Sequence, residues 1–152
     1  MKFTLKNIKF SEFASHDSNC FQATVYIDGK RSGVVNNDGW GGCNNYQWNS
    51  KDIEDKVRTW ELAQPKLPSK YNDDGLDFDL DFLIHDLFCS DGDRKQRQKW
   101  AKSGRVTVYR LDGDEKGSYR TIEGSVEHHL PRIRAKHEGA TVFNKRGELI
   151  EA

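Results

Sequence analysis

The run Cys20-Phe-Gln-Ala-Thr-Val-Tyr-Ile-Asp-Gly-Lys30 decides the fold of the N-terminal part of the chain. Its first eight residues are rich in β-branched and aromatic side chains, which favour a strand. Asp28-Gly29 follows directly, and an Asp-Gly pair between two extended runs is a strong hairpin signal. The sequence therefore predicts an antiparallel hairpin, with residues 32–35 as the returning strand.

The segment before this hairpin predicts a further strand. Apolar residues alternate at Phe3 and Leu5, and then at Ile8 and Phe10 after a one-residue slip at Asn7. A slip of this kind is typical of a β-bulge. We therefore expect an N-terminal antiparallel β-meander of about three strands.

Helical signals follow in the centre of the chain. Ser50 can cap a helix that places Ile53, Val57, Trp60 and Leu62 or Ala63 on one face and ends before Pro65. Residues 76–89 predict a second helix with Asp residues in its first turn. Residues 93–103 predict a third, basic helix that Gly104 ends.

The C-terminal third predicts a hairpin, a helix and a second hairpin. The expected elements are strands at 105–111 and 118–122, a helix from Ser125 to about residue 136, and strands at 141–143 and 148–150. The segment between Pro65 and Gly75 is too short to separate domains. The fold class is thus α+β, with a single domain over residues 1–152.

Composition narrows the function classes. The chain of 152 residues has 24 Lys and Arg against 24 Asp and Glu, whereas a nonspecific nucleic-acid binder is usually basic overall. Three widely spaced cysteines indicate reduced thiols in a cytosolic compartment. Residues 1–13 lack the apolar core of a signal peptide, and no run approaches the roughly 18 apolar residues of a membrane span. We expect a cytoplasmic protein with no membrane partner.

The most unusual segment is residues 36–48, which read Asn-Asn-Asp-Gly-Trp-Gly-Gly-Cys-Asn-Asn-Tyr-Gln-Trp. We interpret it as a loop, because glycine and asparagine adopt positive φ at low cost. Exposed aromatic residues there would be good anchors for a partner. The alternative is a structured connection whose aromatic side chains cap the core. The candidate partner-binding residues are Asp38, Trp40, Tyr46 and Trp48.

Charge is divided into two blocks. Residues 73–93 contain acids but no Lys or Arg, and residues 94–110 contain bases but no acid. An acidic helix could present carboxylates to a basic partner, and its candidates are Asp77, Asp79 and Asp81. A basic helix could contact phosphates, and its candidates are Arg94, Lys95, Arg97, Lys99, Trp100 and Lys102. The alternative is two solvated helix faces that attract each other.

The sequence contains no clear motif for a catalytic or a metal-binding site. The histidines and cysteines match no zinc spacing, and residues 112–123 imitate a calcium loop but place Lys116 at a ligand position. A hairpin turn explains that stretch better. Cys43 could act as a nucleophile, but nothing in the sequence pairs it with a base. We therefore predict no catalytic residue, metal or cofactor, and an enzyme is not favoured.

Several stretches resemble a family of small uncharacterised proteins encoded by bacteriophages and prophages. They are Phe10-Ser-Glu-Phe-Ala14, Ala23-Thr-Val-Tyr-Ile-Asp-Gly-Lys30, Asn36-Asn-Asp-Gly-Trp-Gly-Gly-Cys43, Leu76-Asp-Phe-Asp-Leu80 and Ile84-His-Asp-Leu87. The resemblance covers about the first 90 residues and supplies no activity or catalytic residue. It implies the cytoplasm of a bacterial host and an accessory role during infection.

Three functional hypotheses follow. The first is a phage accessory protein that inhibits a host protein or nucleoprotein, such as a defence or CRISPR complex, by stoichiometric binding. The second is a small-ligand-binding protein or enzyme that uses the segment 36–48 and Cys43 as a pocket. The third is a nucleic-acid binder through the basic segment 94–110. The oligomeric state is not predicted.

Overall fold

The computed structural model describes residues 1–151, and within them it combines three helices with two antiparallel sheets. The predicted α+β class is thereby confirmed. The chain divides into two compact units, Met1–Phe88 and Cys89–Ala152. The single domain over residues 1–152 stays a prediction. No helix among the described residues is both long and apolar enough to cross a membrane.

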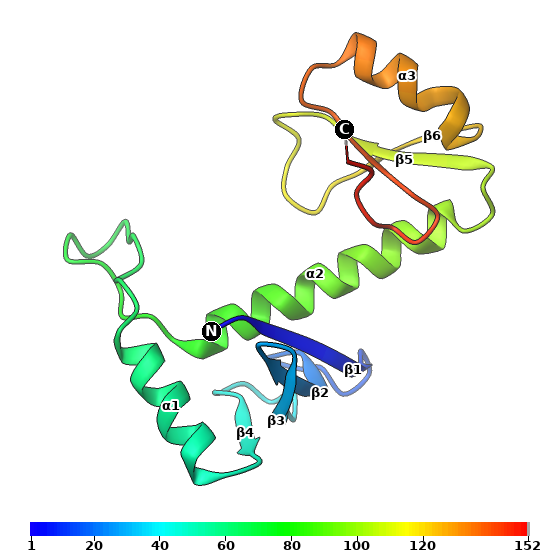
Figure 1. Ribbon diagram of the computed structural model, residues 1–152. Helices are drawn as coiled ribbons and strands as arrows, with labels where there is room; N and C mark the ends of the chain where they lie inside the picture. Colours follow the sequence, from blue (N-terminus) through cyan, green and yellow to red (C-terminus); the bar gives the residue numbers. More distant parts are fainter. Residues whose placement is uncertain (152) are drawn as a thin grey trace. The chain divides into compact units, whose positions relative to one another are not determined.

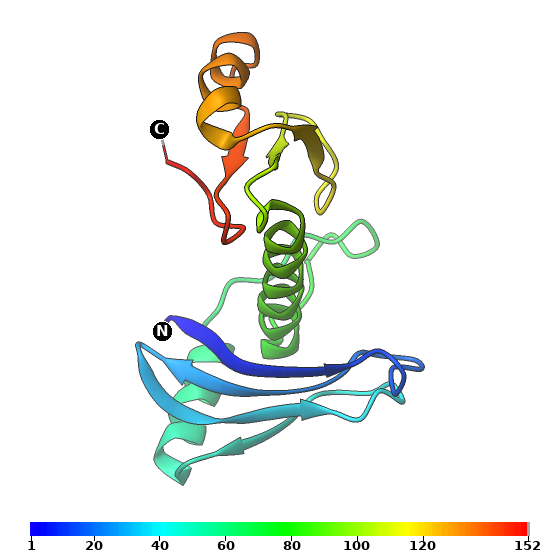
Figure 2. The ribbon, with the colours of Figure 1, turned by 90° about the vertical axis from the view of Figure 1, so that its right-hand side faces the viewer.

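The first unit contains a four-stranded antiparallel sheet (Figures 1 and 2). Its strands follow in chain order as β1 (Phe3–Ser11), β2 (Cys20–Ile27), β3 (Lys30–Asn37) and β4 (Asn45–Trp48). The predicted meander is confirmed and gains a fourth strand. The prediction of a loop over 36–48 is wrong at both ends, because Asn36 and Asn37 finish β3 and residues 45–48 pair with it.

The turn and the bulge lie where the sequence predicts them. Asp28 and Gly29 have φ of 49° and 80°, the positive values that a tight two-residue hairpin requires. Asn7 has φ of 53°, and the β1–β2 register shifts between Lys6 and Lys9. The bulge therefore absorbs the slip in the apolar pattern.

One face of this sheet carries the core of the first unit. Ala23, Val25 and Val35 are almost fully buried there, and Val57 of α1 (Lys51–Leu62) joins their cluster. Ser50 caps α1, because its side chain accepts a hydrogen bond from the Ile53 amide at 3.3 Å. The predicted cap and apolar face of α1 are confirmed, except at its end, where Leu62 is 82% exposed and Ala63 is exposed too.

The prediction of two separate helices over 76–89 and 93–103 is wrong. A single helix, α2, runs over Leu80–Ala101. It starts late because the Asp79 side chain accepts the Asp81 amide at 2.8 Å, as an N-cap does. It continues through Gly92, where a glycine costs only about 1 kcal/mol, and Asp91 supports that turn by pairing with Arg94 and Lys95.

The second unit holds a three-stranded sheet in the order β6-β5-β7. Its elements are β5 (Val106–Arg110), β6 (Arg120–Glu123), α3 (Val126–Lys136) and β7 (Thr141–Phe143). The predicted hairpin and the Ser125-capped helix are confirmed. The closing hairpin is reduced to a single bridge between Phe143 and Leu149, because β7 pairs instead with β5.

We predict that Ile84→Ala destabilises the protein by about 2–5 kcal/mol, the usual cost of a cavity at a fully buried site. Ile84 is 0% exposed and lies in the core of the first unit. Leu62→Ala removes a similar side chain from an exposed position and should change stability by less than about 0.5 kcal/mol. Urea unfolding of both variants checks this, and similar losses would contradict the assignment of the core.

Candidate functional site

Two loops meet at one end of the four-stranded sheet, and we call residues 12–19 and 38–44 together the double loop. They connect β1 to β2 and β3 to β4, and they lie at the same end in Figure 2. The Gly39 carbonyl accepts hydrogen bonds from three successive amides, those of His16, Asp17 and Ser18, at 2.9, 3.0 and 3.2 Å. This contact ties the first loop to the second.

The Asn37 side chain forms hydrogen bonds to both loops of the double loop. It is only 7% exposed. Its Oδ1 accepts the Ser18 hydroxyl at 2.7 Å and the Gly39 amide at 3.0 Å, while its Nδ2 donates to Asn44 Oδ1 at 3.1 Å. The Ser18 hydroxyl oxygen in turn accepts the Gly41 amide at 3.1 Å. A satisfied, buried polar network of this kind fixes the loops in one conformation.

Gly39 is required by this close approach. Its φ is +87°, and a Cβ placed on it would lie 2.2 Å from the Ala14 carbonyl oxygen. Gly42 has nearly the same φ, +86°, but nothing lies within 4 Å of an added Cβ. Gly39 therefore serves the packing of one loop on the other, which supports the interpretation as a structured connection.

Aromatic side chains nevertheless remain at the surface of the double loop. Trp40 is 66% exposed and Phe13 is 96% exposed. The Trp40 ring stacks on His16, with ring centroids 4.0 Å apart and planes inclined by 20°. Asp38 is also exposed, and its Oδ1 accepts the Trp40 amide at 3.2 Å. Trp40 and Asp38 thus lie together at an accessible position.

Tyr46 and Trp48 lie elsewhere, on β4, and both pack against the core of the first unit. Their rings stack with centroids 5.4 Å apart. The Tyr46 hydroxyl donates to Asp81 Oδ1 at 2.5 Å, and the Asn44 amide donates to Asp81 Oδ2 at 2.9 Å. Asp81 therefore fastens the start of α2 to β4, which is a structural role.

A shallow cleft of about 280 Å³ lies beside this contact. Its lining residues include Cys43, Glu61, Asp79 and Asp81. Burial, followed by repulsion from the Asp79 and Asp81 carboxylates, raises the pKa of Glu61. Asp77 is outside this group, because it is 91% exposed and pairs with Lys66 at 3.5 Å. The structure therefore gathers two of the three candidate acids near Tyr46 and leaves Asp77 apart.

Half of the candidate residues in the basic segment are engaged within the second unit. Arg97 donates to the Gly147 carbonyl at 2.9 Å and to the Tyr119 hydroxyl at 2.7 Å, and its guanidinium lies over the Phe143 ring. Arg94 and Lys95 both pair with Asp91. Lys99, Trp100 and Lys102 are exposed. Three of the six candidate residues for nucleic acid are thus held by contacts inside the protein.

Cys43 is an exposed free thiol. Residues 1–151 contain no cluster of three or more His, Cys, Asp or Glu side chains arranged to hold a metal ion. In the calcium-like stretch, Asp114 is bound by Arg120 through both oxygens at 2.8 and 2.9 Å, which holds the pKa of Asp114 at about 2. That carboxylate stabilises the β5–β6 hairpin.

Sequence reasoning missed the residues that build the double loop. Asn37 and Ser18 were not among the candidate residues, and the histidines entered the prediction only as possible zinc ligands. The Asp38-Gly39 pair that directly follows Asn37 within the predicted loop 36–48 was the available hint. The partner of Asn37, a serine 19 positions away, could not be named from the sequence.

A comparison of the chain with protein-family models, with curated proteins and with solved structures finds no match.

We predict that Gly42→Ala costs about 1–2 kcal/mol, the price of a side chain in left-handed backbone. Gly39→Ala should cost about 1–3 kcal/mol more, because its Cβ also overlaps the Ala14 carbonyl. Urea unfolding of the two variants measures the difference. Equal losses would contradict the close packing of the two loops.

We predict that the Tyr46 hydroxyl stays protonated at pH values near and above 10, at which a solvent-exposed tyrosine ionises. Burial and the hydrogen bond to Asp81 raise the pKa of Tyr46 far above its ordinary value of 10.0. Tyr46→Phe should therefore leave the tyrosinate absorbance at about pH 11 unchanged. Since the folded state holds this proton more tightly than the unfolded state, the stability from Tyr46 is complete below pH 10 and falls above it. A lower absorbance in the variant would contradict the buried contact.

Proposed function

We propose that this chain is a binding protein that acts by stoichiometric attachment of its double loop to another protein. The observation that carries the proposal is the exposure of Trp40 and Phe13 on loops held rigid by Asn37 and Gly39. Large aromatic side chains supply much of the energy of protein interfaces. Loops already fixed in one conformation lose little entropy on binding.

The charge around these aromatic residues indicates the kind of surface they fit. The double loop carries Glu12, Asp17 and Asp38, and it contains no Lys or Arg. A complementary partner would offer an apolar pocket for Trp40 with basic residues at its rim. Such a surface would accept the Trp40 side chain in its pocket and pair its basic residues with the carboxylates of the double loop.

The resemblance to small phage-encoded proteins suggests where that partner lies. On this basis the partner is a host protein or nucleoprotein in the bacterial cytoplasm, and the chain inhibits it by occupying its surface. The cleft that Cys43 and Tyr46 line is open to solvent, which gives the ligand-pocket alternative less support. Tyr46, Trp48 and Asp81 support the fold of the binding unit rather than the contact itself.

We predict that Trp40→Ala weakens partner binding by at least about 30-fold, the effect of losing about 2 kcal/mol at a central interface residue. The tagged protein would be used to capture its partner from a bacterial lysate, and the affinity of the purified pair would be measured by calorimetry. The variant should stay folded, because the Trp40 side chain is mostly exposed.

Tyr71→Ala is the matched control, since Tyr71 is an aromatic residue that is 98% exposed outside the double loop. It should bind as the unmodified protein does. Loss of binding in Trp40→Ala alone supports the proposal. A partner that binds both variants equally, or no stoichiometric partner at all, would contradict it.

A further inference from the structure

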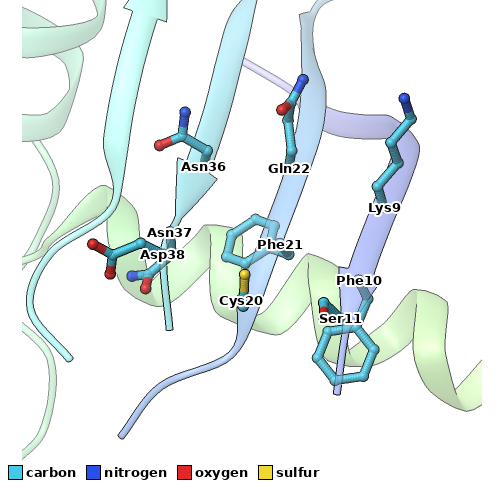
Figure 3. Close-up of a pocket in the computed structure, with 9 residues that line it drawn as sticks. All are labelled: Lys9, Phe10, Ser11, Cys20, Phe21, Gln22, Asn36, Asn37 and Asp38. Carbon is cyan, nitrogen blue, oxygen red and sulfur yellow. The ribbon is translucent and has the colours of Figure 1, made fainter. Parts of the chain in front are cut away.

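The face of the first sheet opposite the core is polar and lacks a covering helix in the first unit. Helices α1 and α2 contribute to the core cluster on the other face, with Phe21, Ala23 and Val25. Residues paired across antiparallel strands point to the same side. Lys9 pairs with Gln22 and Gln22 with Asn36, so the three form a row on this outer face. Figure 3 shows their side chains pointing the same way from three adjacent strands.

Cations continue across the outer face. Lys6 pairs with Thr24, and its Nζ lies 4.4 Å from the centre of the Tyr26 ring. Arg31 pairs with Tyr26 on the neighbouring strand. The outer-face positions of the four strands carry three cations, Lys6, Lys9 and Arg31, and none of the strands contains Asp or Glu. In a chain of zero net charge, this segregation places three cations and no strand carboxylate on one face, which favours an anionic ligand there.

The same face presents four side-chain amides, which belong to Gln22, Asn36, Asn45 and Gln47. Within residues 1–151, these amides make no side-chain hydrogen bond to the protein, and the nearby Lys9 forms no ion pair. Lys9, Gln22 and Asn36 line a hollow of about 480 Å³ at the edge near the double loop, and the exposed carboxylate of Asp38 lines it too (Figure 3). Donors that the fold does not use are thus gathered in one place.

We propose that this outer face binds the sugar–phosphate backbone of double-stranded DNA through Lys6, Lys9 and Arg31, none of which belongs to the double loop. Lys, Arg, Asn and Gln are side chains that contact phosphate oxygens. Stacking on unpaired bases is disfavoured, because Tyr26 is the one aromatic residue among the paired outer-face positions and Lys6 covers its ring. The face therefore suits the regular backbone of a duplex, without sequence readout.

The test is the salt dependence of binding to a fluorescent DNA duplex of random sequence. Three phosphate contacts, from Lys6, Lys9 and Arg31, predict a slope of log K against log salt of about −2.7. Affinity should fall about forty-fold between 50 and 200 mM salt. Each of Lys6→Gln, Lys9→Gln and Arg31→Gln should reduce the slope by about 0.9, and the triple variant should lose the salt-dependent binding.

The matched controls are Lys99→Gln and Lys102→Gln, which remove exposed cations of α2 and its C-terminal end. They should leave the slope unchanged, and thermal melting would confirm that every variant is folded. Loss of binding in these controls alone would overturn the proposal and favour the basic helix. Equal or tighter binding of single-stranded DNA or of polyglutamate would also overturn it, as would no measurable binding at 50 mM salt.

Discussion

The alternation along β2 is the constraint on which the first unit depends. Ala23 and Val25 point into the core, whereas Gln22 and Thr24 point to the opposite face. A shift of one residue in the register would exchange the two sets and bury polar groups in place of apolar ones. Because β2 is paired on both sides, its register also sets the positions of β1 and β3. The core and the polar outer face are therefore two consequences of one strand.

The double loop is a second level of organisation that rests on this sheet. Asn37 ends β3 with its side chain buried, and the network around it joins two connections that lie far apart in sequence. Glycine is needed at position 39 because the backbones nearly touch there. Trp40 is thus an exposed aromatic side chain on a loop that hydrogen bonds hold in one conformation, which is the arrangement expected of an interface anchor.

Charge in this chain is balanced overall but separated locally. The strands of the first sheet carry only cations, whereas the double loop carries only carboxylates among its charged residues, apart from its histidine. The acidic and basic blocks along the sequence are used differently: Asp81 is bound to β4, and Arg97 is bound to Gly147 and Tyr119. A block of charge in the sequence is therefore a poor guide to which charges remain available.

The sequence by itself determined the features that depend on neighbouring residues. These are the Asp28-Gly29 turn, the bulge at Asn7, the Ser50 cap and the α+β class. Such features arise from local backbone preferences and periodicity, which a single segment contains. The joining of two predicted helices across Gly92 was missed, because side-chain pairing and packing outweigh a weak local penalty.

Only the tertiary structure decided which candidate residues remain accessible. It left Trp40 exposed, but it packed Tyr46 and Trp48 against the core. It also engaged Arg97 in hydrogen bonds within the second unit. It also showed that Asn37 organises the double loop, a role invisible in the sequence. The physical reason is that these outcomes depend on contacts between segments distant in the chain, and a residue's own type does not reveal which partner will reach it.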